Sequence, residues 1–122
     1  MLRALQKGEI VGITPDQQPK QGGGEFVPFF GIPALTLSLI AKLAARSGAP
    51  VLFSYCERND DGSFDVHIDA DEPGLRDPDL MAALSVMNLR VQAIAGRDFR
   101  QYQWTYKRFS IRPDPSEKKP YR

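Results

Sequence analysis

His67 is the only histidine in the chain, and two other residues have the type and spacing for joint chemistry with it. A hairpin turning on Asp61-Gly62 would place Cys56 opposite His67, and a thiolate beside an imidazolium is a nucleophile. Glu72 gives the spacing His-x4-Glu, in which a carboxylate orients a histidine base. Cysteine is more often a small core residue, and carboxylates are dense around Glu72, so we interpret both pairings as coincidental. A single histidine excludes a histidine-rich metal site.

A glycine triplet and an Asp-Gln pair could together form an anion or substrate site. Gly22-Gly23-Gly24 would let backbone N–H groups approach a phosphate, although position 27 is valine and the spacing matches no nucleotide-binding fingerprint. Asp16 and Gln17 follow a predicted strand, where open α/β sheets place their ligands. A carboxylate there could orient a substrate hydroxyl or hold a basic side chain. The structural alternatives are a flexible loop and an Asp-initiated turn.

Residues 101–113, QYQWTYKRFSIRP, mix aromatic and basic side chains. One interpretation is a C-terminal helix that packs its aromatic residues on the core and points its cations to water. The others are a clamp for phosphate or lipid headgroups, or a nucleic-acid platform. Residues 97–122 hold eight basic and three acidic side chains, a net charge of +5, whereas residues 1–96 have −4. The block is short and the remainder is acidic, so we do not expect nucleic acid as a partner.

Composition restricts the class of protein. A chain of 122 residues suffices for one domain, and 42% hydrophobic with 25% charged residues is ordinary globular composition. One cysteine excludes an intrachain disulfide framework. No run reaches the about 18 apolar residues of a membrane-spanning helix, and the N-terminus lacks the apolar centre of a signal peptide. We therefore expect this chain to be soluble and cytoplasmic.

Turn residues and apolar periodicity divide the chain into alternating helices and strands. The expected elements are a helix ending at Gly8, a buried strand 9–14, a loop 15–25, a loop or edge segment 26–31, a helix from Pro33 to Ser47, strands 50–57 and 63–69 joined by a hairpin turn, and a helix 77–95. The predicted class is α/β, with a small mixed sheet, a parallel strand–helix–strand unit, a hairpin and flanking helices. Three strands are few for this class, so we expect the chain to be a fragment that lacks its front part.

Four blocks in order resemble the C-terminal part of the bacterial lipid A biosynthesis lauroyl/myristoyl acyltransferases. They are Gly8–Gln17, Gly24–Gly31, Ala41–Val51 and Gln101–Pro113. The resemblance runs from about Leu2 to Pro113. We accordingly expect residues 1–113 to be the C-terminal portion of an acyltransferase domain and residues 114–122 to be a polar tail.

The resemblance implies part of a three-layer acyltransferase fold and a specific reaction. Such enzymes move a fatty acyl group from acyl carrier protein to a hydroxyl of a lipid A precursor, at the cytoplasmic face of the inner membrane, without a cofactor. Their His-x4-Asp/Glu dyad lies upstream of the Asp16-Gln17 block. This implies no catalytic residue in this chain and no activity of the chain alone. The alternative is a non-catalytic module from a truncated gene that binds anionic lipid or phosphate.

The resemblance also implies a set of substrate-binding residues and no metal ligands. These are Asp16, Gln17, Gly23, Gly24, Phe29, Phe30, Arg108 and Arg112. The Asp-Gln pair would line the active-site cleft, the glycines and phenylalanines would shape acceptor and acyl binding, and the arginines would contact lipid phosphates. Two positions depart from the family's pattern: Gln18, where many members have an acidic or small residue, and Tyr106, where some have histidine.

Overall fold

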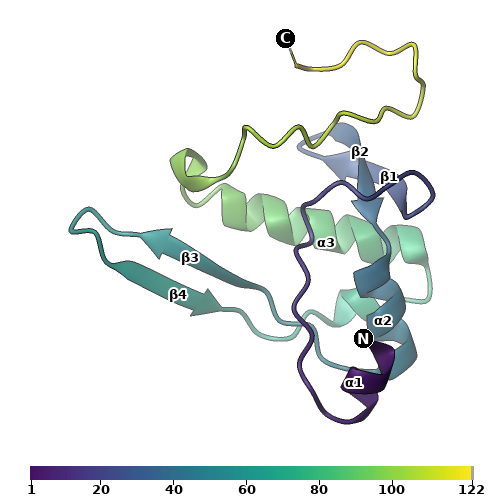
Figure 1. Cartoon of the computed structure of the whole chain (residues 1–122), viewed down its shortest axis with the longest axis vertical. Helices are drawn as coiled ribbons and strands as arrows, with labels where there is room; N and C mark the ends of the chain where they lie inside the picture. Colours follow the sequence, from purple (N-terminus) through teal and green to yellow (C-terminus); the bar gives the residue numbers. More distant parts are fainter. Residues whose placement is uncertain (122) are drawn as a thin grey trace.

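The computed structural model describes residues 1–121, and its elements pack around one long helix. In chain order they are α1 (Leu2–Gln6), β1 (Gly24–Phe29), β2 (Ile32–Leu37), α2 (Leu39–Ser47), β3 (Ser54–Arg58), β4 (Phe64–Ile68), the 3-10 turn η1 (Pro73–Arg76), α3 (Leu80–Ala95) and the 3-10 turn η2 (Phe99–Gln101). Figure 1 shows α3 crossing the centre of the molecule, with the β1–β2 hairpin and α2 against it and the β3–β4 ribbon projecting to one side.

The core lies between α3 and the β1–β2 hairpin. Apolar side chains alternate along β1, so that Val27 and Phe29 are buried against Leu84 and Met87 of α3. Asn88 is the polar centre of this contact, because its Nδ2 donates to the carbonyl of Pro28 at 2.9 Å and to Thr36 Oγ1 at 3.1 Å. A buried amide satisfied by both strands fixes the hairpin on the helix.

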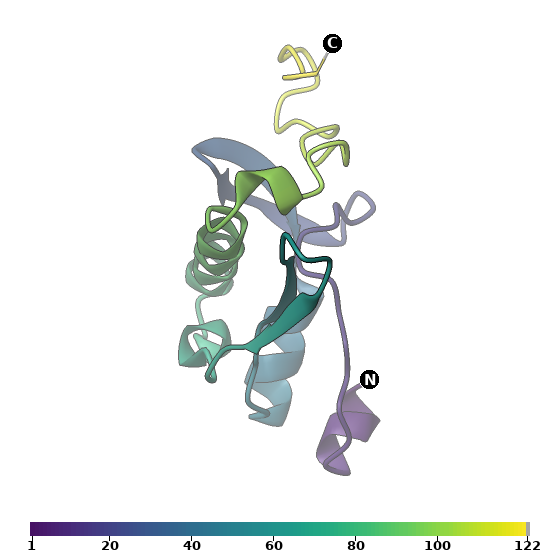
Figure 2. The same cartoon turned by 90° about the vertical axis from the view of Figure 1, so that its left-hand side faces the viewer.

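The predicted strand 9–14 is wrong as a paired element. Residues 9–14 belong to no helix or strand, no strand of residues 1–121 pairs with them, and Ile10 is 97% exposed. Figure 2 shows the segment after α1 running alone along one edge of the molecule. β-branched residues favour an extended backbone, but a strand also needs a neighbour that supplies its hydrogen bonds.

Residues 24–37 form a β-hairpin. Of the two expectations for residues 26–31, a loop or an edge segment, the edge strand is confirmed by β1, whereas β2 lies where we expected the start of a helix. The two residues between the strands, Phe30 and Gly31, both have positive φ, +49° and +76°, as a tight hairpin turn requires. Pro28 and Pro33 face each other in the register. The predicted helix therefore begins later, at Leu39, and ends as expected before Gly48.

The β3–β4 hairpin is confirmed, with a register shifted by one residue from the predicted one. Tyr55 faces His67 and Cys56 faces Val66, because the loop closes through a hydrogen bond from Asn59 N to Ser63 O. A shift of one residue moves a side chain to the other face of the ribbon, so the Cys56–His67 pairing is wrong.

The class is mixed α and β, as predicted, but the sheet arrangement differs. Within residues 1–121 both sheets are two-stranded and antiparallel, and the parallel strand–helix–strand unit is not confirmed. The helix predicted over 77–95 is confirmed as α3, with Asp79 rather than Asp77 at its N-cap, accepting from Met81 N at 2.9 Å. Residues 101–113 form turns, not the C-terminal helix that one interpretation predicted.

Candidate functional site

Side chains from three distant blocks of the sequence meet beneath the β1–β2 hairpin. The Tyr102 hydroxyl donates to Asp16 Oδ2 at 3.2 Å, and the Tyr102 ring lies 6.3 Å from that of Phe29. The Arg108 guanidinium carbon lies 5.7 Å from the centre of the Phe29 ring. Three of the four residues, Asp16, Phe29 and Arg108, belong to the predicted site, and the structure brings them together.

Arg108 is a buried cation, only 3% exposed. One terminal nitrogen donates to the Leu35 carbonyl, and the other donates to Thr36 Oγ1 at 3.0 Å. Its Nε has no hydrogen-bond partner in the described part of the chain, and no carboxylate there forms an ion pair with it. Burial lowers the pKa of this guanidinium, while the dipoles of β2 and the face of the Phe29 ring favour its charge.

Tyr102 contacts the Asp16 carboxylate and lies near the same Phe29 ring as Arg108. Burial raises the pKa of Tyr102 well above its usual value, and the negative charge of Asp16 raises it further. The phenol therefore remains protonated and acts as the donor in its hydrogen bond to Asp16. Tyr102 was not among the predicted site residues, although the aromatic and basic composition of residues 101–113 had pointed to its block.

The C-terminal block also covers the residues after Asp16. Gln18 N donates to the Tyr106 hydroxyl at 2.8 Å, and Ile111 N donates to Gln18 Oε1 at 3.0 Å. The two positions that depart from the family's pattern, Gln18 and Tyr106, are thus in direct contact. Gln17, which lies between Asp16 and Gln18 in the sequence, is exposed. The C-terminal block therefore contacts the segment that we expected to line the active-site cleft.

The glycines of the predicted site are places of close chain approach. A Cβ on Gly24 would lie 2.0 Å from the Thr36 carbonyl oxygen, so any side chain there would clash with the opposite strand. The Gly23 N–H already donates to Lys20 O at 2.9 Å, and Gly23 O accepts from Ser38 N at 3.2 Å. The backbone N–H of Gly23 is therefore already paired within the loop.

Arg112 and Arg108 hold the C-terminal block on one edge of β2. Arg112 donates to Pro33 O at 3.0 Å, two residues before the Leu35 carbonyl that Arg108 uses. Carbonyls two residues apart face the same side of a strand. Arg112 also pairs with Glu117 at 2.5 Å. In this structure the donors of both predicted phosphate contacts are largely engaged by the protein itself.

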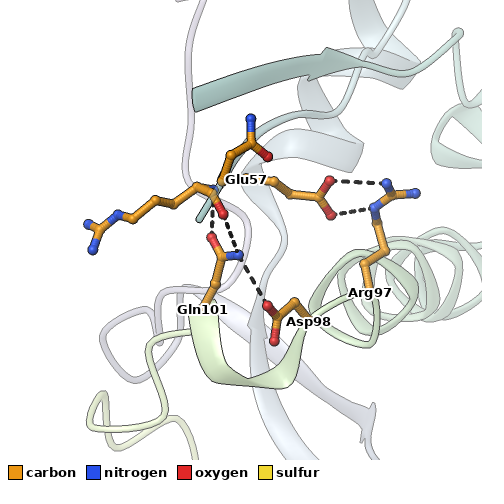
Figure 3. Close-up of a pocket in the computed structure, with 6 residues that line it drawn as sticks. Glu57, Arg97, Asp98 and Gln101 are labelled. Atoms are coloured by element: carbon orange, nitrogen blue, oxygen red, sulfur yellow. Dashed lines mark hydrogen bonds and ion pairs between the residues drawn. The ribbon is translucent and has the colours of Figure 1, made fainter. Parts of the chain in front are cut away.

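A second polar cluster lies where the β3–β4 ribbon meets η2 (Figure 3). It surrounds an open cavity of about 430 Å³ lined by Glu57, Arg58, Asn59, Arg97, Asp98 and Gln101. Arg97 holds Glu57 through two nitrogens, at 2.6 and 3.1 Å. These bonds lower the pKa of the Glu57 carboxyl. Gln101 hydrogen-bonds the Arg58 N–H and carbonyl at 2.7 and 3.1 Å, so the cluster fixes the ribbon to the end of α3.

His67 belongs to this cluster and not to the pairs considered from sequence. Its Nε2 lies 2.9 Å from Glu57 Oε2, without the alignment of a hydrogen bond, and its ring stacks on Tyr55. Glu72 instead accepts from Gly74 N at 3.3 Å and lies 3.6 Å from Arg90. Within residues 1–121 no group of three or more His, Cys, Asp or Glu side chains is arranged to hold a metal ion.

Comparison with known proteins identifies the family. The family described as bacterial lipid A biosynthesis acyltransferase matches residues 1–110. The chain belongs to this family. The lipid A biosynthesis palmitoleoyltransferase of Escherichia coli K12 is 33% identical over 112 residues, which are 90% of this chain and 36% of that protein. The lipid A biosynthesis lauroyltransferase of the same organism is 33% identical over 118 residues, 93% of this chain and 38% of that protein.

A third lipid A acyltransferase relative, from Shigella flexneri, is also 33% identical over 112 residues. The chain spans little more than a third of the length of these relatives. Among residues 1–121, no helix has both the length and the apolar character needed to span a membrane. The resemblance in the four sequence blocks is thus confirmed at the level of the family.

Proposed function

We propose that the protein containing this chain transfers a fatty acyl group from acyl carrier protein to a hydroxyl of a lipid A precursor, at the cytoplasmic face of the inner membrane and without a cofactor. The observation that carries this proposal is the family match over residues 1–110. The relatives named palmitoleoyltransferase and lauroyltransferase support fatty acyl transfer in lipid A biosynthesis.

The reaction forms an ester and releases a thiol. The acceptor hydroxyl oxygen attacks the thioester carbonyl while a base removes its proton, and the carrier thiolate leaves with a proton. We propose that a histidine–carboxylate pair outside this chain supplies the base. We call Asp16, Phe29, Tyr102 and Arg108 the Asp16 group. His67 is not proposed as the base, because Glu57 is held by Arg97 and the cluster that contains both lies on the β3–β4 ribbon, not in the Asp16 group.

The Asp16 group is proposed as the acceptor side of the site. Asp16 Oδ1 makes no hydrogen bond within residues 1–121, and Gln17 is exposed, so both retain polar atoms for a sugar hydroxyl. Arg108 stabilises the group through its hydrogen bond to Thr36 of β2 and its contact with the Phe29 ring. Phe30 is 37% exposed and is proposed as a contact for the lipid. Arg112 is bound to Pro33 and Glu117, so its proposed contact with the lipid requires that a lipid phosphate replace the Glu117 carboxylate.

A chimeric enzyme tests the proposal. The matching segment of the E. coli lauroyltransferase is replaced by this chain, and the product is expressed in a strain that lacks lauroyl transfer. We expect acylated lipid A by mass spectrometry, and a loss of about tenfold or more with Asp16→Ala, because misplacing the acceptor slows transfer. Asp114→Asn, in the tail beyond the family match, is the matched control and should leave the yield unchanged.

Two results would contradict the proposal. A folded chimera that transfers no acyl group to lipid A would remove the acceptor function. Acyl transfer by the isolated chain, abolished by His67→Ala, would show that the catalytic pair lies within these residues and that its assignment elsewhere is wrong.

A further inference from the structure

Three aromatic side chains form an exposed cluster at one end of α3. We call Phe30, Phe99 and Trp104 the aromatic patch; they are 37%, 55% and 47% exposed. Their ring centres lie 5.6 Å apart for Phe30 and Trp104, 6.0 Å for Phe99 and Trp104, and 6.3 Å for Phe30 and Phe99. Figures 1 and 2 both place the β1–β2 turn and η2 beside the C-terminal end of α3. A contiguous apolar surface of this kind is typical of an interaction site.

The backbone at Phe30 is an independent sign that the patch is used. Phe30 is the one non-glycine residue of the described chain with positive φ, +49°, and it holds the first position of a turn that favours asparagine or glycine. Its N–H donates to Gln92 Oε1 at 2.7 Å, so α3 holds the strained turn in place. Strain of this kind, combined with an exposed phenyl ring, is typical of a functional surface.

The patch can leave water without breaking a hydrogen bond. The Trp104 indole N–H donates to Phe99 O at 2.7 Å, and the Phe30 N–H is satisfied by Gln92. An apolar environment penalises unpaired donors heavily, and these donors are paired internally. The rings can therefore enter an apolar medium as a unit.

The charge of the C-terminal segment indicates which kind of apolar medium the aromatic patch contacts. Lys107, Lys118 and Lys119 are exposed, and none forms an ion pair with a carboxylate of residues 1–121. They belong to the segment 97–122 of net charge +5, which also carries two of the three rings. A segment that combines exposed aromatic rings with lysines that form no ion pair is typical of the boundary between lipid headgroups and acyl chains.

We propose that the aromatic patch is a membrane-contact surface that inserts Phe30, Phe99 and Trp104 into the interface of an anionic bilayer. The proposal rests on the proposed function only for the choice of a lipid partner, and its test requires no acyl transfer. A failure of lipid binding and a failure of catalysis are therefore separate results.

Trp104 is the only tryptophan, so its fluorescence reports the patch directly. The purified chain is titrated with vesicles of phosphatidylcholine alone and of phosphatidylcholine mixed equally with phosphatidylglycerol. We expect a blue shift of the emission, quenching by brominated acyl chains, and binding several-fold tighter to the anionic vesicles.

Phe30→Asn separates lipid contact from folding. Asparagine suits a positive φ, so the fold is retained, while loss of the ring lowers vesicle partitioning about tenfold. Phe99→Ser is the second patch variant and should act in the same direction. Met81→Gln is the matched control: Met81 is 44% exposed at the other end of α3, and binding should not change. Far-UV circular dichroism confirms that each variant folds.

Several outcomes would overturn the proposal. One is no blue shift with anionic vesicles. Another is wild-type partitioning for both folded patch variants. A third is a blue shift that follows protein concentration without lipid, which would show that a second copy of the chain covers the patch. Binding that salt abolishes and bromolipids never quench would assign the contact to the lysines alone.

Discussion

At the scale of single residues, Arg108 and Arg112 illustrate how one residue type serves two different roles. Both donate to carbonyls of β2, but Arg108 is buried against Phe29 while Arg112 forms an ion pair with Glu117. A buried guanidinium is supported by fixed dipoles, and its removal leaves a cavity and unpaired acceptors. The Arg112 side chain is 10% exposed, but its partner Glu117 is open to solvent, and an ion pair of this kind contributes less.

We expect Arg108→Ala to lower the free energy of unfolding by about 2–4 kcal/mol. Arg112→Ala should lower it less, by about 1 kcal/mol, because it loses one hydrogen bond to Pro33 O and an ion pair whose Glu117 partner is open to solvent. Urea unfolding followed by circular dichroism measures both. Equal losses for the two variants would contradict the structural role of Arg108.

Asp71 makes the stability of the chain depend on acid pH. Its carboxylate receives two bonds from Arg76, at 2.6 and 2.9 Å, and one from Val51 N at 2.7 Å. The hydrogen bond with Arg76, followed by that from Val51, lowers the pKa of Asp71 from 3.8 to about 2. A carboxyl whose pKa is lower in the folded state stabilises that state above its unfolded pKa and loses this effect as pH falls toward its folded pKa.

Between pH 4 and pH 2, we therefore expect the wild-type chain to lose the stabilisation that the ionised Asp71 carboxylate provides. Asp71→Asn has no carboxylate at this position, so it lacks this stabilisation at every pH. The stability of the variant should change less steeply with pH over this range, measured by urea unfolding at each pH. Asp65→Asn is the matched control: it removes the same charge, but no side-chain hydrogen bond is lost with it. Parallel pH profiles for wild type and Asp71→Asn would refute the assignment.

At the scale of elements, the β1–β2 hairpin depends on a glycine that sequence reasoning had assigned to substrate. Gly24 faces Leu37 across the hairpin, and the Thr36 carbonyl occupies the space of its absent side chain. Two strands can approach this closely only where one of them has no Cβ.

We expect Gly24→Ala to destabilise the chain by about 1–3 kcal/mol, because the new methyl group must push β1 from β2. Gly12→Ala, with no atom within 4 Å of its added Cβ, should change stability by less than about 0.5 kcal/mol. Thermal unfolding distinguishes the two. A neutral Gly24→Ala would show that the strands are not held this closely.

At the scale of the whole molecule, stability is concentrated in one half of the structure. The contacts of α3 with β1, β2 and η1 bury most of the core, whereas the β3–β4 ribbon exposes Phe64, Val66 and Ile68. Residues 10–14 lie outside both sheets. Local opening should therefore differ between these regions.

Amide hydrogen exchange should show this difference. We expect slow exchange in the middle of α3, faster exchange in β3–β4, and exchange near that of an unfolded peptide for residues 10–14, because their amides have no partner within residues 1–121. Slow exchange at residues 10–14 would show that this segment pairs with another strand in solution.

The sequence alone determined the features that depend on neighbours a few residues away. The periodicity of residues 80–95, the glycine after α2 and the turn at 59–62 each specify local geometry, and the four blocks identified the family. The tertiary structure decided which residues pair and which are buried. It set the β3–β4 register in which Tyr55 faces His67, it left residues 9–14 without a paired strand in the described chain, and it buried Arg108. Local conformation follows from the backbone preferences of adjacent residues, whereas pairing and burial depend on residues distant in the sequence, whose positions only the folded chain fixes.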